Sequence, residues 1–162
     1  MKLKLFGAVA AIALMTGGTA NALVFDTFGT TTNLTDTTIG GDVTDTIVDG
    51  ANILGGERET FLSLQSGSQA DVDINSPNPG VLSLNNDTGS RSNLTLRYDG
   101  VGAAGLGGVD ATEGGAHNAF DLFIQFDDSP IDIRLTAFSA TGSSDLLLSA
   151  PGNIFNVPGF EA

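Results

Sequence analysis

Apolar and polar residues alternate in short runs from residue 23 onward, and each run is bounded by Gly, Asn, Asp or Pro. Val72 and Ile74, for example, alternate with Asp71 and Asp73. A period of two is typical of a β-strand with one buried face and one solvated face. The runs fall at residues 61–64, 71–74, 81–84, 94–98, 120–126, 131–138 and 146–148.

Helical spacing is nearly absent from the same region. No stretch of ten residues places apolar side chains at i, i+3, i+4 and i+7 without also containing Gly, Pro or a run of β-branched residues. We therefore predict an all-β fold of about nine short strands, either an antiparallel β-sandwich or a jelly-roll-like arrangement.

The clearest alternation lies in two neighbouring runs, 120–126 and 131–138. The residues between them, Asp127-Asp128-Ser129-Pro130, are typical of a tight turn. The sequence therefore predicts that the two runs pair as a hairpin at the centre of the core. The solvated face of this hairpin would carry Asp121, Gln125, Asp132 and Arg134.

Two segments depart from the strand pattern. The segment from Thr30 to Thr46 is rich in Thr and Asp and poor in large apolar residues, which predicts a weak edge region or a long loop. Residues 99–119 are rich in glycine and lie between two predicted strands. A loop of about 20 residues is uncommon in a compact domain and often carries function. Residues 99–119 are therefore the candidate site.

The first 22 residues have the order of a secretory signal peptide. Lys2 and Lys4 precede an apolar run from Leu5 to Met15, and Ala20-Asn21-Ala22 provides a small-residue cleavage site. The apolar run is well short of the ~20 residues that a membrane-spanning helix needs. We predict a signal-peptide helix in residues 1–22, cleavage after Ala22, and a single β-sandwich-like domain in residues 23–162 with no membrane insertion.

Both lysines of the chain lie in the predicted leader, so the remaining chain has four arginines against 19 acidic residues, a formal net charge of −15. This charge disfavours binding to nucleic acid and to anionic membranes. The chain contains no cysteine, which excludes disulfides, thiolate metal sites and cysteine nucleophiles. Its stability must come from an ordinary core.

Three segments follow one another in a distinctive order: ILGGERE at 53–59, LRYDG at 96–100, and GGVDATEGGAHNAF at 107–120. This order resembles the exported proteins that accompany exosortase, the PEP-CTERM group, over about residues 45–150. The resemblance implies a secreted or cell-surface protein of the envelope or extracellular matrix. It also implies export through the inner membrane of a Gram-negative-type cell, with exopolysaccharide or other matrix proteins as partners and a link to biofilm.

Members of that group end in a Pro-Glu-Pro motif, an apolar helix and a basic tail. This chain ends at Gly159-Phe160-Glu161-Ala162. We interpret it either as a member shortened at its C-terminus or as a variant that is simply secreted. Residues 154–157 look like the start of a strand with no partner, which favours the shortened form.

Calcium is the metal that the candidate site would suit, because hard cations take oxygen ligands from Asp, Asn and backbone carbonyls on a turning loop. Asp99, Asp110, Glu113 and Asn118 could supply such ligands, whereas solvated turn residues are the alternative interpretation. A second acidic set alternates at residues 71, 73 and 75, but it lacks the Gly and the closing Glu of an EF-hand loop.

No catalytic residue or cofactor is predicted. His117 is the only histidine, no G-x-S-x-G motif is present, and the paired carboxylates lie adjacent in loops. Gly55-Gly56 predicts a tight turn that opens a strand, and Arg58 should pair with an acid. The sequence thus favours a non-enzymatic structural protein of the cell surface or matrix, with a calcium-dependent carbohydrate-binding or adhesion module as the alternative.

Overall fold

The structure is a computed structural model that describes residues 23–109, 122–127, 129–152 and 154–160. The predicted signal-peptide helix therefore lies outside the described residues. The described chain forms two compact units, which meet in sequence after Val109. The prediction of a single domain over 23–162 stays a prediction.

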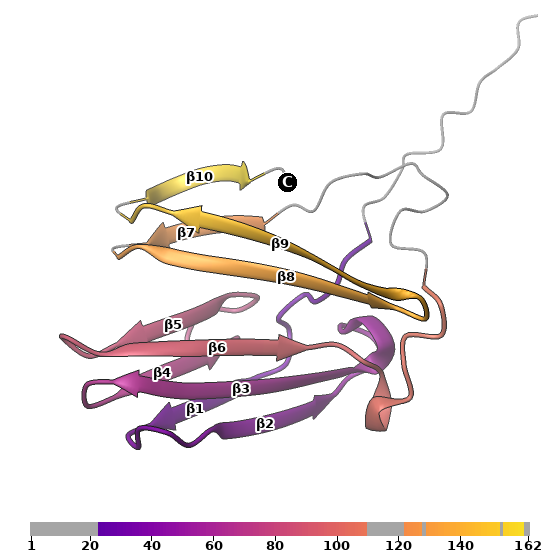
Figure 1. Cartoon of the computed structure of the whole chain (residues 1–162), viewed down its shortest axis with the longest axis horizontal. Helices are drawn as coiled ribbons and strands as arrows, with labels where there is room; N and C mark the ends of the chain where they lie inside the picture. Colours follow the sequence, from indigo (N-terminus) through magenta and orange to yellow (C-terminus); the bar gives the residue numbers. More distant parts are fainter. Residues whose placement is uncertain (1–22, 110–121, 128, 153, 161–162) are drawn as a thin grey trace, which may run out of the picture. The chain divides into compact units, whose positions relative to one another are not determined.

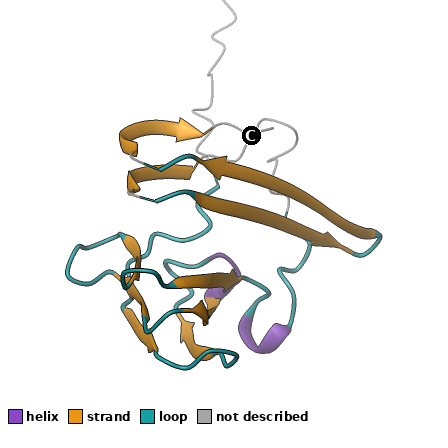
Figure 2. Ribbon diagram, turned by 60° about the vertical axis from the view of Figure 1, so that its left-hand side comes forward, coloured by secondary structure: helices purple, strands orange, loops and turns teal. Residues whose placement is uncertain are grey.

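The predicted all-β, antiparallel fold class is confirmed. Every strand pairing among the described residues is antiparallel. Apart from strands, the described chain contains only loops and two short 3₁₀ turns, η1 (Leu54–Gly56) and η2 (Val101–Ala103) (Figure 2). No helix in this part of the chain is long and apolar enough to cross a lipid bilayer.

The first unit is a sandwich of two three-stranded sheets (Figure 1). One sheet has the order β1-β4-β5 and consists of β1 (Thr32–Asp36), β4 (Ala70–Ile74) and β5 (Leu82–Asn86). The other has the order β2-β3-β6 and consists of β2 (Val43–Val48), β3 (Glu57–Ser66) and β6 (Arg91–Arg97).

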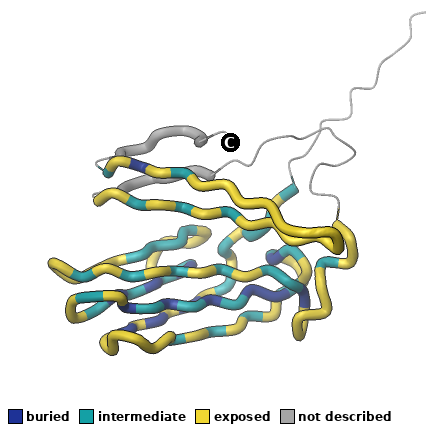
Figure 3. The backbone as a smooth tube through the Cα atoms, viewed as in Figure 1, coloured by how far each residue is buried: buried dark blue, intermediate teal, exposed yellow. Residues whose placement is uncertain are grey.

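The core of the first unit lies between these two sheets. Burial alternates along β3 and β4 with the period of two that the sequence predicts (Figure 3). The buried side chains that pack together are Leu34, Leu62, Leu64, Ala70, Val72 and Ile74. Half-buried side chains of β2, β5 and β6 complete the contact from both sheets.

The segment 30–46 contains β1 and most of β2, and each strand lies at the edge of its sheet. The prediction of an edge region is confirmed, and the long-loop alternative is wrong. Thr32 and Asp36 of β1 point inward and are buried beside Leu34. The segment looked weak in sequence because its inward positions are polar, and it forms a strand because the sandwich supplies partners for them.

The second unit contains β7 (Leu122–Asp127), β8 (Ile131–Ser139), β9 (Gly142–Ala150) and β10 (Ile154–Phe160). The hairpin predicted between 120–126 and 131–138 is wrong, because β7 pairs with β10 and β8 pairs with β9. Ser139 pairs directly with Gly142, so a two-residue turn joins β8 to β9. Such short turns favour the pairing of the strands that flank them.

Two further expectations about this region need correction. Residues 154–157 do have a strand partner, since β10 runs antiparallel to β7. The predicted core centre at 120–138 is also wrong for the described side chains, because the buried hydrophobic cluster lies in the first unit. Asp132 and Arg134 are solvated, as expected, while the side chains of Asp121 and Gln125 lie outside the described part.

The core predicts that shortening a buried valine lowers the free energy of unfolding much more than shortening an exposed valine of the facing sheet. Val72 is 0% exposed, whereas Val48 is 62% exposed. Val72→Ala removes two buried methyl groups and should lower the free energy of unfolding by about 2 kcal/mol. Val48→Ala, the matched control, should change it by less than ~0.5 kcal/mol. Urea unfolding followed by circular dichroism measures both, and equal losses would contradict the core described here.

Candidate functional site

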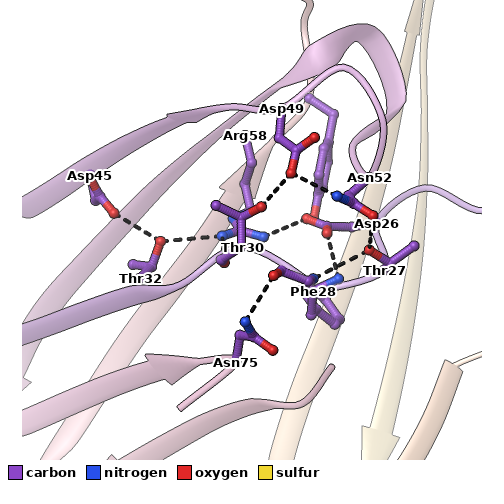
Figure 4. Close-up of polar contacts among 12 residues, drawn as sticks. Asp26, Thr27, Phe28, Thr30, Thr32, Asp45, Asp49, Asn52, Arg58 and Asn75 are labelled. Carbon is purple, nitrogen blue, oxygen red and sulfur yellow. Dashed lines mark hydrogen bonds and ion pairs between the residues drawn. The ribbon is translucent and has the colours of Figure 1, made fainter. Parts of the chain in front are cut away.

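The most extensive polar cluster in the described chain surrounds Arg58, the second residue of β3 (Figure 4). Its guanidinium is fully buried and points between the two sheets. One terminal nitrogen forms an ion pair with Asp26 at 2.7 Å. The other donates to the carbonyl oxygen of Thr30 at 3.0 Å and to the hydroxyl of Thr32 at 3.2 Å. The expectation that Arg58 pairs with an acid is confirmed.

Asp26 is almost as deeply buried as Arg58, with 2% of its side chain exposed. Its carboxylate also accepts hydrogen bonds from the Tyr98 hydroxyl at 3.1 Å and from the Phe28 amide at 2.7 Å. Burial raises the pKa of Tyr98, and the neighbouring Asp26 charge raises it further. The phenol is therefore a permanent donor to the ion pair. The Phe28 ring lies 5.9 Å from the guanidinium carbon of Arg58.

These contacts fasten residues 25–31, which we call the N-terminal strap. Backbone hydrogen bonds hold the strap to the loop before β3: Leu54 donates to Phe25 at 2.8 Å, and Thr27 donates to Asn52 at 3.0 Å. From the other sheet, the Asn75 amide donates to the Gly29 carbonyl at 2.8 Å. The strap thus closes one end of the sandwich.

Asp49, in the loop after β2, organises the outer part of this cluster. Its carboxylate accepts hydrogen bonds from the Thr30 hydroxyl, from the Asn52 amide at 2.8 Å, and from the Ala51 backbone at 3.0 Å. These bonds, and above all the one from Thr30, lower the pKa of Asp49 to about 2. The carboxylate is therefore charged at any physiological pH.

Two more carboxylates link strands of opposite sheets. The Thr32 hydroxyl of β1 donates to Asp45 of β2 at 2.8 Å. Farther along β1, Asp36 is buried and accepts the backbone N–H of Leu64 in β3 at 2.7 Å. Buried polar groups are costly without hydrogen-bond partners. These acids therefore stabilise the packing of the two sheets only while their hydrogen bonds to the facing strand are formed.

The turn that carries Arg58 into place is built from the predicted glycine pair. Gly55 and Gly56 have φ angles of 75° and 82°, and Glu57 begins β3 directly afterwards. A φ in this range favours glycine, and a Cβ on Gly55 would lie 2.3 Å from a methyl carbon of Leu106, which would have to move. The prediction of a tight turn that opens a strand is confirmed.

Of the four predicted calcium ligands, only Asp99 lies in the described residues. Its carbonyl accepts the Gly105 N–H at 2.6 Å, and its buried Oδ1 has no hydrogen-bond partner there. Asp110, Glu113 and Asn118 lie outside the described residues, as does His117. Within the described ranges, no group of three His, Cys, Asp or Glu side chains is arranged to hold a metal ion.

The second acidic set does not converge on one point. Asp71 and Asp73 lie on the solvated face of β4, as predicted. Asp71 is bonded to the Thr35 hydroxyl at 2.6 Å and to the Gln69 amide at 2.8 Å. Asn75 has a φ of 58° and turns away to bond Gly29 and Gly80.

The cluster around Arg58 therefore joins the strap to both sheets through mutual partners, while the buried Nε of Arg58 has no hydrogen-bond partner among the described residues. Sequence reasoning found Arg58 but missed Asp26, Tyr98, Thr30 and Thr32. Asp26 lies 32 positions from Arg58, and Tyr98 lies 72 positions from Asp26. The scarcity of bases in an acidic chain indicated that Arg58 would be paired, but no local signal names the partner.

Comparisons with known proteins add no relative. No family model matches the chain, and no curated protein or solved structure is significantly similar to it.

The buried ion pair predicts that removing the carboxylate of Asp26 lowers the stability of the fold far more than removing that of Glu59. Asp26→Ala leaves the Arg58 charge buried without its carboxylate and should lower the free energy of unfolding by about 3–5 kcal/mol. Glu59→Ala breaks the exposed Arg97–Glu59 pair and should cost less than ~1 kcal/mol. Urea unfolding of both variants checks this, and a small loss for Asp26→Ala would contradict the role assigned to the strap.

The low pKa of Asp49 predicts a pH dependence of stability. A carboxyl group whose pKa is lowered by folding stabilises the fold above its unfolded pKa, and this stabilisation disappears as pH falls through the folded pKa. The melting temperature of Asp49→Asn should be below that of the native chain at neutral pH. The difference should shrink between the ordinary pKa of 3.8 and about 2. Thermal unfolding across this range measures it, and a constant difference would contradict the assignment.

Proposed function

We propose that this chain is an exported, non-enzymatic structural protein of the cell surface or extracellular matrix. The observation that carries the proposal is the N-terminal strap. Cleavage after Ala22 would place Asp26 fourth in the mature chain, and Asp26 forms the buried ion pair with Arg58. The mature chain would thus bind its own beginning into the sandwich.

The composition supports the same proposal. A chain without cysteine has no disulfides to hold it together outside the cell, and the buried ion pair and its hydrogen bonds link distant segments by noncovalent means. The strongly acidic charge keeps such a chain soluble. The resemblance to the exosortase-associated group supports a place in the matrix, with polysaccharide or other matrix proteins as partners.

The second candidate is a calcium-dependent carbohydrate-binding or adhesion module. The observation that favours it is the Asp99 carboxylate, whose buried Oδ1 has no hydrogen-bond partner among the described residues. A cation held by this loop would supply one. The other proposed ligands, Asp110, Glu113 and Asn118, lie outside the described residues, so this candidate rests on Asp99.

Fractionation of cells that express the full chain with a C-terminal tag tests the first proposal. We expect the protein at the surface or in the medium, with Leu23 as its first residue by mass spectrometry. A matched variant with Ala20→Arg and Ala22→Arg should remain unprocessed, because small residues are required at the cleavage site. Native chain found in the cytoplasm with residues 1–22 intact would refute the proposal.

A further inference from the structure

The solvent-facing side of the sheet β2-β3-β6 has a composition unlike the rest of the acidic chain. The ladder places Thr44, Phe61 and Thr95 in one row across the three strands. We call this side the Phe61 face. Its outward residues are Thr44, Thr46, Val48, Glu59, Phe61, Ser63, Gln65, Arg91, Asn93, Thr95 and Arg97.

Phe61 lies on the central strand of this face, and its side chain is turned away from the core. The guanidinium carbon of Arg97 lies 4.9 Å from the centre of its ring. Arg97 is also held by Glu59 at 2.9 Å, and 53% of its side chain remains exposed. The ring and the guanidinium therefore form one fixed, partly apolar surface. A planar cation over an aromatic ring is a favourable arrangement.

Hydroxyl and amide side chains surround Phe61 and Arg97 on this face, where Arg91 and Glu59 are the other charged residues. Thr44 and Thr95 flank Phe61 directly, and Asn93 pairs with Ser63 in the next row. Thr44, Asn93 and Thr95 are exposed, whereas Ser63 and Phe61 itself are half-buried. Hydroxyl and amide groups both donate and accept hydrogen bonds. The face thus combines an aromatic centre with a surround of neutral hydrogen-bonding groups.

The Phe61 face differs in charge from the outer side of the other sheet, β1-β4-β5. The exposed charges of the Phe61 face are Arg91, Arg97 and the paired Glu59, whereas the outer side of β4 carries Asp71 and Asp73. Half of the arginines of residues 23–162 therefore lie on one face. Because charges farther apart than about 8 Å are largely screened at physiological salt, a ligand here meets a nearly neutral surface.

We infer that the Phe61 face binds a neutral polysaccharide chain. The apolar C–H face of a pyranose ring would pack on the stacked pair that the exposed Arg97 guanidinium forms with the half-buried Phe61 ring, and sugar hydroxyls would bond the flanking threonine and asparagine side chains. This arrangement places hydrogen-bonding groups around an aromatic platform, which suits a ligand with an apolar face and polar edges. The inference rests on the proposed function, since it names the matrix component that such a protein would hold.

Retention on insoluble cellulose, chitin and curdlan tests the inference, using purified residues 23–162. We expect binding to at least one of the three polysaccharides. Phe61→Ala should weaken it about tenfold or more, as for an aromatic at the centre of an interface. Arg97→Lys, which keeps the charge but loses the planar group, should weaken it as well. Phe138→Ala is the matched control, because Phe138 is 84% exposed in the second unit.

The outcomes distinguish binding at the Phe61 face from calcium-dependent binding elsewhere and from no binding. Loss of retention in Phe61→Ala, with the native melting temperature and with normal binding by Phe138→Ala, supports the inference. Retention by none of the three polysaccharides overturns it, and so does retention that needs calcium and is unchanged by Phe61→Ala. Because the test uses purified protein, its failure leaves the export experiment unaffected, and failure of export leaves the binding result standing.

Discussion

The buried ion pair between Arg58 and Asp26 is the contact on which the first unit depends most. Taking both charges out of water is costly, and the cost is offset only while each keeps its hydrogen-bond partners. The Tyr98 hydroxyl, after β6, provides a partner for Asp26, and the Thr30 carbonyl of the strap provides one for Arg58. The pair therefore fixes the position of the strap more specifically than a contact between apolar residues could, because its charge-assisted hydrogen bonds are directional.

The same constraint explains the unusual polarity of the edge strand β1. Thr32 and Asp36 occupy inward positions that an ordinary core would fill with apolar side chains. Each has a partner across the sandwich, Arg58 and Asp45 for Thr32 and the Leu64 backbone for Asp36. Polar groups between the sheets thus specify which edges meet, while Leu62, Val72 and their neighbours provide the apolar burial.

The outward faces of the two sheets are free of this constraint, and they differ. One carries Asp71 and Asp73, with Asp71 bonded by short polar side chains, and the other carries Phe61 under Arg97. An outward aromatic contributes less to the core than an inward one. Phe61 instead packs under the guanidinium of Arg97 on the solvent side of its sheet.

The sequence by itself determined the approximate positions of β3 to β9, the antiparallel all-β class, the turn at Gly55-Gly56 and the pairing of Arg58 with some acid. These features follow from period-two alternation and local turn chemistry, which act over a few residues. Only the tertiary structure decided that Asp26 is the acid, that β7 pairs with β10, and that the polar segment 30–46 forms two edge strands. Alternation shows which side of a strand is buried but not which strand lies beside it. Partners distant in sequence are selected by packing and by hydrogen-bond satisfaction in the folded chain.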